Sequence, residues 1–321
     1  MNSPTAAPRV FIVLPCYNEE ECLPHTAEVL KDKMSALCLQ KMIAEDSRIL
    51  FVDDGSEDST WHVIEAMHKT NQLLFGGVKL AHNRGHQQAL YAGLMEALRS
   101  GCDAAISMDA DLQDDVNAID EMIRKFTNEH CEIVYGVRSS RESDTWFKRN
   151  TAQMFYRVSE WMGTETVYNH ADYRLMGNRA LKALAEYSEV KLFLRGVVPS
   201  IGFKTDKVYY ARGVREVGES KYPFKKMIAF AVDGITSFST KPLKFVTIAG
   251  LISTLIGLIM LIYAIASVFG SHAVVGWGSL MCSLWLIGGM LMLSLGIVGE
   301  YVGKIYLESK HRPRFFVEKR I

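Results

Sequence analysis

A long segment without charged side chains constrains this chain more than any other feature of its sequence. From Phe245 to Gly299, fifty-five consecutive residues include no Asp, Glu, Lys or Arg. About 20 apolar residues are enough to cross the hydrocarbon core of a bilayer, so the segment is long enough for two crossings. Gly and His residues interrupt it between Gly270 and Gly278. We therefore expect two transmembrane helices, roughly residues 245–269 and 274–299, joined by a very short hairpin.

The charges on either side of this segment predict its orientation. Lysines precede it, the hairpin has no Lys or Arg, and six basic residues follow it: Lys304, Lys310, Arg312, Arg314, Lys319 and Arg320. By the positive-inside rule, both ends are cytoplasmic. The first apolar stretch, Val10 to Leu14, is too short for a signal peptide. We therefore expect an integral protein of the cell (inner) membrane. The alternative is a soluble protein with two buried core helices. Binding to detergent or lipid would decide between the two.

The net charge of zero conceals two regions of opposite charge. Residues 1–219 carry 25 Lys and Arg against 32 Asp and Glu, whereas residues 220–321 carry 11 against 4. The acidic region offers no general footprint for nucleic acid. We expect residues 1–219 to form a cytoplasmic domain, residues 220–244 a juxtamembrane segment, and residues 300–321 a basic cytoplasmic tail.

Strand-like and helix-like stretches alternate in the acidic region. The apolar or β-branched runs are residues 9–15, 48–54, 75–81, 103–109 and 132–138. The helical stretches between them are residues 19–38, 59–70, 86–100 and 117–128. This alternation predicts a Rossmann-like α/β domain with a mainly parallel sheet. In such domains, ligands bind beyond the carboxyl ends of the strands, and those ends are polar here.

The stretch MDADLQDD, after the fourth predicted strand, is rich in carboxylates. Asp109 and Asp111 have one residue between them, so both side chains can reach one cation. Mg²⁺ and Mn²⁺ prefer such oxygen ligands and keep coordination positions free for phosphate. The spacing therefore predicts a divalent metal that carries a diphosphate, with a solvated loop as the alternative.

Two other strand ends offer candidate contacts to a ligand. Asp53 ends a buried strand, where it is either an acceptor for a base or ribose group or a structural residue. Arg84 precedes Gly85 at the start of a predicted helix. It either faces an anionic ligand or belongs to an ordinary helix entry.

Six motifs occur in a characteristic order: VLPCYNEEE, FVDDGSEDST, NRGHQQAL, MDADLQDD, DYRLM and GESKYPFKKM. Followed by two predicted membrane helices, they resemble the family-2 glycosyltransferases that load a sugar onto a polyprenyl phosphate. These include the bactoprenol glucosyltransferases and, more distantly, the dolichol-phosphate mannose synthases. The similarity covers nearly the whole chain. It implies a GT-A fold, a nucleotide-diphospho-sugar donor, a lipid-phosphate acceptor and inversion at the anomeric carbon.

The resemblance also implies roles for individual residues on the donor side. The positions that hold the nucleotide base and ribose are matched by Pro15, Tyr17, Glu19 and Asp53. The positions for Mg²⁺ or Mn²⁺ and for the diphosphate are matched by Asp109, Asp111 and Gln113. Gln113 is implied as a third metal ligand by the resemblance alone.

On the acceptor side, Arg138 matches a family arginine that meets the acceptor phosphate, and Arg149 is a second match. The dolichol-type relatives usually have a serine four residues after the second arginine, where this chain has Gln153. Lys221, in the family-like GESKY, is predicted to contact either phosphate.

The acceptor's own charge limits what the catalytic residues must do. A phosphate monoester with a second pKa of about 6 is largely ionised at neutral pH, so a strong general base is not required. Asp111 and Arg138 are expected to stabilise charge. Asp172, in HADYRLM, is a candidate base or acceptor for a sugar hydroxyl. A partner for Arg174 or a local cap is the alternative.

The segment before the apolar stretch predicts contact with the membrane surface. Apolar residues recur with helical spacing from Tyr222 to Phe238, with Lys225 and Lys226 near the start. This pattern favours an amphipathic helix in the interface, and a surface helix packed on the catalytic domain is the alternative.

The sequence and the resemblance also lead to expectations about the oligomeric state, the donor and the acceptor. Gly289, Gly296 and Gly303 allow close approach of helices, either within the hairpin of one subunit or between subunits, and the resemblance favours a homo-tetramer. UDP-glucose is the first choice of donor, followed by UDP-N-acetylglucosamine and GDP-mannose, and undecaprenyl phosphate is the expected acceptor. A non-catalytic membrane scaffold is the alternative from a different class.

Overall fold

The computed structural model describes residues 7–139, 170–190, 192–211 and 277–321, together with short helical pieces between residues 243 and 259. The chain divides into two compact units. One contains the α/β domain and residues 313–321, and the other contains the apolar segment as far as Arg312. The predictions for Arg149, Lys221 and the amphipathic helix concern residues outside the described part of the chain.

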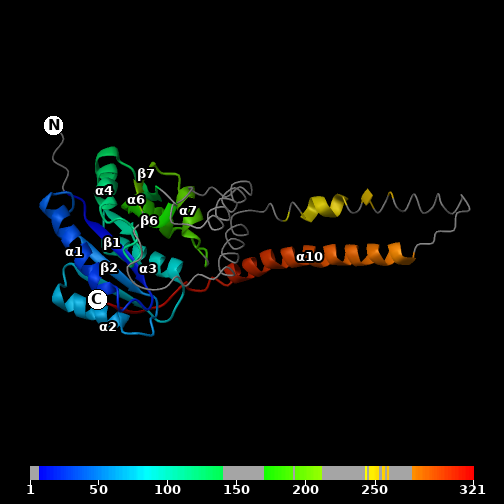
Figure 1. The fold of residues 1–321 in the computed structure, drawn as a ribbon, viewed down its shortest axis with the longest axis horizontal. Helices are drawn as coiled ribbons and strands as arrows, with labels where there is room; N and C mark the ends of the chain where they lie inside the picture. Colours follow the sequence, from blue (N-terminus) through cyan, green and yellow to red (C-terminus); the bar gives the residue numbers. More distant parts are fainter. Residues whose placement is uncertain are drawn as a thin grey trace, which may run out of the picture. The chain divides into compact units, whose positions relative to one another are not determined.

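A mixed sheet forms the centre of the α/β unit (Figure 1). Its strands are β1 (Val10–Cys16), β2 (Arg48–Asp53), β3 (Phe75–Leu80), β4 (Ala104–Ser107), β5 (Ile133–Arg138), β6 (His170–Gly177), β7 (Thr205–Tyr210) and β8 (Val317–Arg320). They are arranged in the order β7-β5-β6-β4-β1-β2-β3-β8. The pairs β1–β2, β2–β3, β1–β4 and β5–β7 are parallel, whereas β6 and β8 run antiparallel to their neighbours. The predicted α/β sheet is confirmed, with antiparallel strands added to its parallel part.

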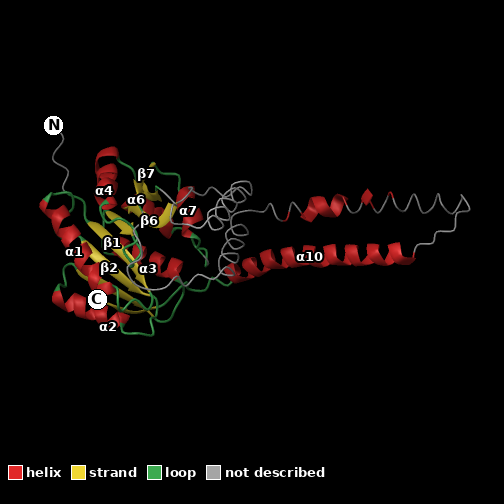
Figure 2. Ribbon diagram, viewed as in Figure 1, coloured by secondary structure: helices red, strands yellow, loops and turns green. Residues whose placement is uncertain are grey.

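The helices that connect the first strands agree closely with the sequence pattern (Figure 2). They are α1 (Leu23–Leu39), α2 (Thr60–Thr70), α3 (His86–Arg99) and α4 (Ala118–Glu129). Two shorter helices, α6 (Asn178–Ala185) and α7 (Leu194–Ser200), flank strands β6 and β7. Helix α1 begins later than expected, and Pro24 lies in its first turn. Proline is favoured there because the backbone N–H groups of a first helical turn have no partner within the helix.

The alternation of side chains along β1 explains how helices cover both faces of the sheet. Ile12 and Leu14 join the buried cluster that includes residues of α1, whereas Val13 points to α3. A Cβ added at Gly93 of α3 would lie 2.3 Å from Val13 Cγ1 and 2.6 Å from Val52 Cγ2. Gly93 therefore lets α3 lie very close to β1 and β2, which fixes the start of α3 at the carboxyl edge of the sheet.

The second unit contains the long helix α10 (Trp277–Ser309). Among the described residues, one helical stretch, Ile287–Ser309, is long and apolar enough to cross a membrane. Its apolar side chains are exposed rather than packed in a core, as at Leu291 and Leu293. The second expected membrane helix, residues 274–299, overlaps α10, and most of the first, residues 245–269, lies outside the described residues. The two-helix hairpin thus stays a prediction.

The segment after α10 returns to the α/β unit as its edge strand. Strand β8 pairs with β3, and the N–H and C=O of Ile321 bond the C=O and N–H of Gly77 at 2.9 and 3.0 Å. Side-chain ion pairs anchor the strand on both sides: Lys319 lies 2.5 Å from Glu65 of α2, and Arg320 lies 3.0 Å from Glu96 of α3. Part of the expected basic tail is therefore an element of the catalytic sheet.

Candidate active site

The loops that follow β1 and β2 hold one another in place. Asn18, which has a left-handed backbone at φ 54°, donates its N–H to Ser56 Oγ at 3.0 Å. Its side-chain oxygen accepts the N–H of Glu57 at 2.9 Å. The N–H of Glu19 bonds Thr60 Oγ1 at 2.9 Å. The two motifs thus form one framework at the carboxyl edge of the sheet, and the main chain of Glu19 is part of it.

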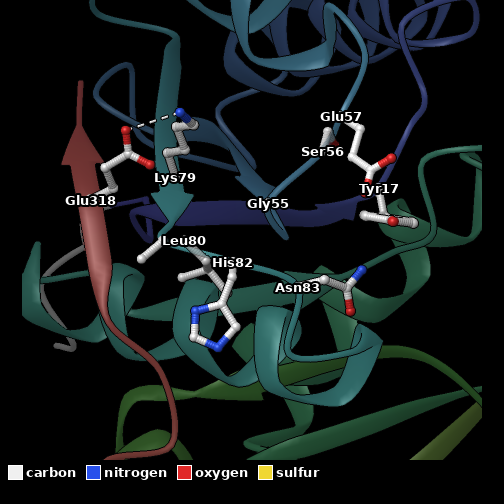
Figure 3. A pocket seen from close by; sticks show the side chains of 10 residues that line it. Tyr17, Gly55, Ser56, Glu57, Lys79, Leu80, His82, Asn83 and Glu318 are labelled. Carbon is white, nitrogen blue, oxygen red and sulfur yellow. Dashed lines mark hydrogen bonds and ion pairs between the residues drawn. The ribbon is translucent and has the colours of Figure 1, made fainter.

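A pocket of about 430 Å³ opens beside this framework (Figure 3). It is lined by Tyr17, Gly55, Ser56, Glu57, Lys79, Leu80, Ala81, His82, Asn83 and Glu318. Tyr17, predicted to hold the nucleotide, is 40% exposed, so its ring face is accessible. Pro15, also predicted, is buried within β1 opposite Val52 and shapes the strand rather than the pocket wall.

The paired aspartates after β2 have different roles. Asp53 is fully buried and accepts the N–H of Ser56 at 3.1 Å through Oδ1, while its Oδ2 is buried without a hydrogen-bond partner among the described residues. Burial raises the pKa of Asp53. Asp54 accepts the N–H groups of Arg84 and Gly85 at 2.7 and 2.8 Å. Asp54 therefore fixes the loop after β3, which leaves the Arg84 side chain exposed.

The carboxylates Asp109 and Asp111 lie just beyond β4. The backbone turns sharply at Leu112, whose φ is 53°, and the N–H of Gln113 reaches Asp111 Oδ1 at 3.2 Å. The Asp109 side chain is 39% exposed. Burial of the group raises the pKa of Asp109, and the charges of Asp172 and Asp111 raise it further. The carboxylates of Asp109, Asp111 and Asp172 thus concentrate negative charge beyond the end of β4.

This set of donors fits a hard divalent cation. Asp109 and Asp111 offer carboxylate oxygens, and Gln113, which is 8% exposed, offers an amide oxygen on the same short turn. Mg²⁺ and Mn²⁺ bind such oxygen ligands, and a cation would offset the negative charge that Asp172 and Asp111 place near Asp109.

Asp172 is held by a dense set of donors. Its carboxylate accepts hydrogen bonds from Arg174 Nη2 at 2.6 Å, from Arg195 Nε and Nη2 at 3.2 and 2.9 Å, and from Gln87 Nε2 at 3.1 Å. Burial opposes ionisation, yet Arg195, His86 and Arg174 hold the pKa of Asp172 well below its usual range. A carboxylate in this state is a poor proton acceptor. These contacts include the pairing with Arg174 that was the alternative, and the role of Asp172 as a base or an acceptor for a sugar hydroxyl stays a prediction.

His86 connects the two acidic groups, and sequence reasoning did not select it. Its Nε2 lies 3.6 Å from Asp109 Oδ1 and 3.5 Å from Asp172 Oδ2. Although burial opposes it, the hydrogen bond to Asp172 and the charge of Asp109 raise the pKa of His86. The sequence signal that could have indicated His86 was the glycine before it. Gly85, with a φ of 89°, precedes the first turn of α3, and His86 is the first residue of that helix.

Arg138, predicted to meet the acceptor phosphate, lies in a polar cluster with Asp114 and Tyr210 that is within electrostatic reach of Asp109. Its Nη2 is 3.5 Å from Asp114 Oδ1, and its Nε donates to the Tyr210 hydroxyl at 3.4 Å. The Tyr210 hydroxyl donates in turn to Asp114 Oδ1 at 2.5 Å. The side chain of Asp114 is 1% exposed. Arg138 is thus oriented by a buried carboxylate while keeping part of its own surface exposed.

Comparisons with known proteins agree with this architecture. Residues 11–200, more than half of the chain, match the model of the family described as glycosyl transferase family 2. The glycosyltransferase YkoT of Bacillus subtilis is 48% identical over 311 residues, which cover 97% of this chain and 91% of that protein. The bactoprenol glucosyl transferase of Shigella phage SfV is 36% identical over 315 residues, which cover 97% of this chain and 98% of that protein.

Among solved structures, the chain is similar to glucosyl-3-phosphoglycerate synthase from Mycobacterium tuberculosis, with a TM-score of 0.46 and 15% identity over 72% of this chain and 77% of that one. The family match and the two relatives cover the polar strand ends described above. The chain therefore belongs to glycosyl transferase family 2 and is a transferase enzyme.

Proposed function

We propose that the protein transfers a hexose, with glucose as first choice, from a nucleotide-diphospho-sugar to a polyprenyl phosphate, with inversion at the anomeric carbon. Undecaprenyl phosphate is the proposed acceptor, and the cytoplasmic membrane face is the proposed location. The observation that carries this proposal is the extent of the similarity to the bactoprenol glucosyl transferase of phage SfV. It covers 97% of this chain and therefore includes residues of the apolar helix α10 as well as the catalytic domain.

The donor would lie across the carboxyl ends of β1, β2 and β4. The pocket beside Tyr17 would take the base, and the accessible Tyr17 ring offers a surface for stacking. Asp53 Oδ2 is a buried acceptor without a partner in the described part of the chain, and a base or ribose donor could satisfy it. The exposed Arg84 side chain is the proposed cation for the donor phosphates.

Asp109, Asp111 and Gln113 would hold Mg²⁺ or Mn²⁺. The ion, when bound, would neutralise charge on the departing nucleotide diphosphate. The chain's own contribution is the turn at Leu112, where the N–H of Gln113 bonds Asp111 Oδ1 at 3.2 Å and holds that carboxylate.

The acceptor would arrive already charged. A polyprenyl phosphate with a second pKa of about 6 is largely ionised at pH 7, so alignment of its oxygen behind the anomeric carbon is the main requirement. Arg138, oriented by Asp114 and Tyr210, is the proposed contact for this phosphate. Asp172, held ionised by two arginines, fits a reaction that needs no strong base.

Helix α10 is the proposed membrane anchor and a proposed site of oligomer contact. A Cβ added at Gly289, Gly296 or Gly303 would meet no atom within 4 Å in the described residues, so this face of the helix is open to a neighbouring helix. Cross-linking in native membranes tests the proposed tetramer, and monomer bands alone would contradict it.

A transfer assay tests the proposed reaction. The full chain, purified in detergent, is incubated with undecaprenyl phosphate, Mn²⁺ or Mg²⁺, and radiolabelled UDP-glucose, UDP-N-acetylglucosamine or GDP-mannose. We expect label from UDP-glucose to enter the lipid phase and EDTA to block the transfer. Transfer from another donor would revise the sugar, and the absence of both transfer and nucleotide binding would favour the non-catalytic scaffold.

A further inference from the structure

The pairing of β8 with β3 contains an irregularity beside the pocket. Lys79 is opposite Lys319, but the next residue, Leu80, is opposite Val317, so Glu318 has no residue directly opposite it in the backbone register of β3. One extra residue on one strand is the mark of a β-bulge, and bulges commonly redirect a side chain beside a functional site. Here the bulge brings Glu318 to Lys79, whose Nζ lies 3.0 Å from Glu318 Oε1.

This ion pair forms part of the wall of the pocket (Figure 3). The side chain of Lys79 is 26% exposed and that of Glu318 is 52% exposed, so both side chains keep surface that a ligand can contact. Tyr17 and Asn83 line another part of the same pocket. An ammonium group carries three N–H donors, and a carboxylate has two oxygens that only accept. The pair therefore presents a donor and an acceptor side by side.

That combination matches one class of base edge. Uracil and guanine each place a carbonyl oxygen next to a ring N–H, so Lys79 can donate to the oxygen while Glu318 accepts from the N–H. Cytosine and adenine instead place an amino group, which donates, next to a ring nitrogen that carries no hydrogen and accepts. Against such an edge, the Lys79 donor would face a donor, and the Glu318 acceptor would face an acceptor. Sites built from hydrogen-bonding groups reject an edge that leaves those groups unpaired.

We propose that Lys79 and Glu318 form the base-selecting pair of the donor site, favouring uracil or guanine nucleotides over cytosine and adenine nucleotides. Glu318 belongs to β8 and thus reaches this site from beyond helix α10 in the sequence. The inference rests on the proposed use of a nucleotide-diphospho-sugar. It adds a specificity-determining residue that neither the motifs nor the strand ends of the catalytic domain contain.

Glu318→Gln tests the pair, because it keeps the shape of the side chain and an acceptor for Lys79 but adds an N–H donor. The full-length protein in detergent is titrated calorimetrically with UDP and with CDP in the presence of Mn²⁺. We expect the Kd for UDP to rise about 10- to 100-fold, the range for a lost hydrogen bond to a charged group. The Kd for CDP should not rise, so the preference for UDP over CDP should shrink by at least about tenfold.

Glu65→Gln is the matched control. It weakens the ion pair to Lys319, which anchors the same strand, and it lies outside the pocket lining. Equal losses of UDP binding in Glu65→Gln and Glu318→Gln would show that only the docking of the strand matters and would overturn the inference. An unchanged ratio of UDP to CDP affinity in Glu318→Gln would also overturn it while leaving the proposed reaction intact. A wild-type protein that binds no nucleoside diphosphate would reject the proposed reaction itself.

Discussion

The guanidinium of Arg195 donates two hydrogen bonds to the carboxylate of Asp172, from Nε at 3.2 Å and from Nη2 at 2.9 Å. Two contacts from one planar group fix the orientation of a carboxylate as well as its charge. Arg174 adds a third contact at 2.6 Å. Asp172 is therefore an organising anion that connects β6, α7 and the start of α3.

Replacing this anion should destabilise the catalytic domain. In Asp172→Asn, the Arg174 side chain, which is 1% exposed, would keep a buried charge without its counter-ion. Removing one partner of a buried ion pair costs about 3 to 5 kcal/mol, and Arg174 leaves little room for water to compensate. Denaturant unfolding of the detergent-purified protein measures the loss. A change of less than about 1 kcal/mol would contradict the assigned role.

The stability difference between the wild type and Asp172→Asn should depend on pH. The pKa of Asp172 is held well below its usual range in the folded protein by Arg195, His86 and Arg174. Its ionised form therefore stabilises the fold above the unfolded pKa of about 3.9, and this contribution is lost as the pH falls through the folded pKa. Because Asp172 also raises the pKa of His86, the difference should change as His86 titrates above about pH 6. At lower pH, we expect the difference to narrow between about pH 4 and 3 as Asp172 is protonated. A difference that widens between about pH 4 and 3 would contradict the assigned sign.

Asp111→Asn should abolish transfer and weaken the binding of Mn²⁺. Asparagine keeps an oxygen for the N–H of Gln113 but removes the negative charge. We expect the transfer rate to fall by at least about 100-fold, as when one preorganised charge-stabilising group is removed. Electron paramagnetic resonance of Mn²⁺ reports the binding directly. Asp115→Asn, which retains an acceptor for the N–H of Asn117, is the control and should behave like the wild type.

Tyr210→Phe should impair use of the lipid acceptor more than binding of the donor. It removes the hydroxyl that donates to the buried Asp114 and accepts from Arg138. The loss of one partner of a buried carboxylate costs about 1 to 3 kcal/mol, and Arg138 also loses a fixed orientation. We expect a higher KM for the polyprenyl phosphate with a nearly unchanged Kd for UDP. Equal effects on both substrates would argue that Tyr210 acts only on stability.

Arg314→Ala should loosen the segment that leads into β8. The Arg314 guanidinium lies 4.3 Å from the centre of the Tyr91 ring, and its Nε donates to the carbonyl of Glu189 at 2.7 Å. Its Nη2 donates to the carbonyl of Tyr187. Losing these contacts should reduce stability by about 1 to 2 kcal/mol, which thermal unfolding can measure. Arg312→Ala removes an exposed arginine of equal charge two residues away and should have little effect.

Much of the central sheet could be predicted because its strands carry strong local patterns. The apolar runs at residues 9–15 and 48–54 became β1 and β2 with shifts of one residue. Strand β8 could not be predicted in this way. Its sequence, VEKR, is charged and mostly exposed, so only pairing with β3 makes it a strand.

The residues of the candidate site likewise include some that a local sequence pattern predicts and others that it does not. Asp109 and Asp111 were predictable since they are neighbours in the sequence and follow a recognisable strand. His86, Arg195 and Glu318 were not, because each gains its role only when distant segments meet. Asp172 was predicted as a candidate base, but two arginines from different elements decide its ionisation. Local spacing can suggest a ligand set, whereas the charge state of a buried group depends on the whole fold.

The late position of β8 in the sequence has a consequence for the protein during its synthesis. Lys79 and Glu318 are separated by 239 residues. At about 5 to 20 residues per second, the ribosome needs on the order of 10 to 50 s to make the chain between them. During that interval, the open edge of β3 can pair with other nascent chains, as exposed strand edges do. The edge of β3 is therefore covered by β8 only after the apolar helix α10 has been made.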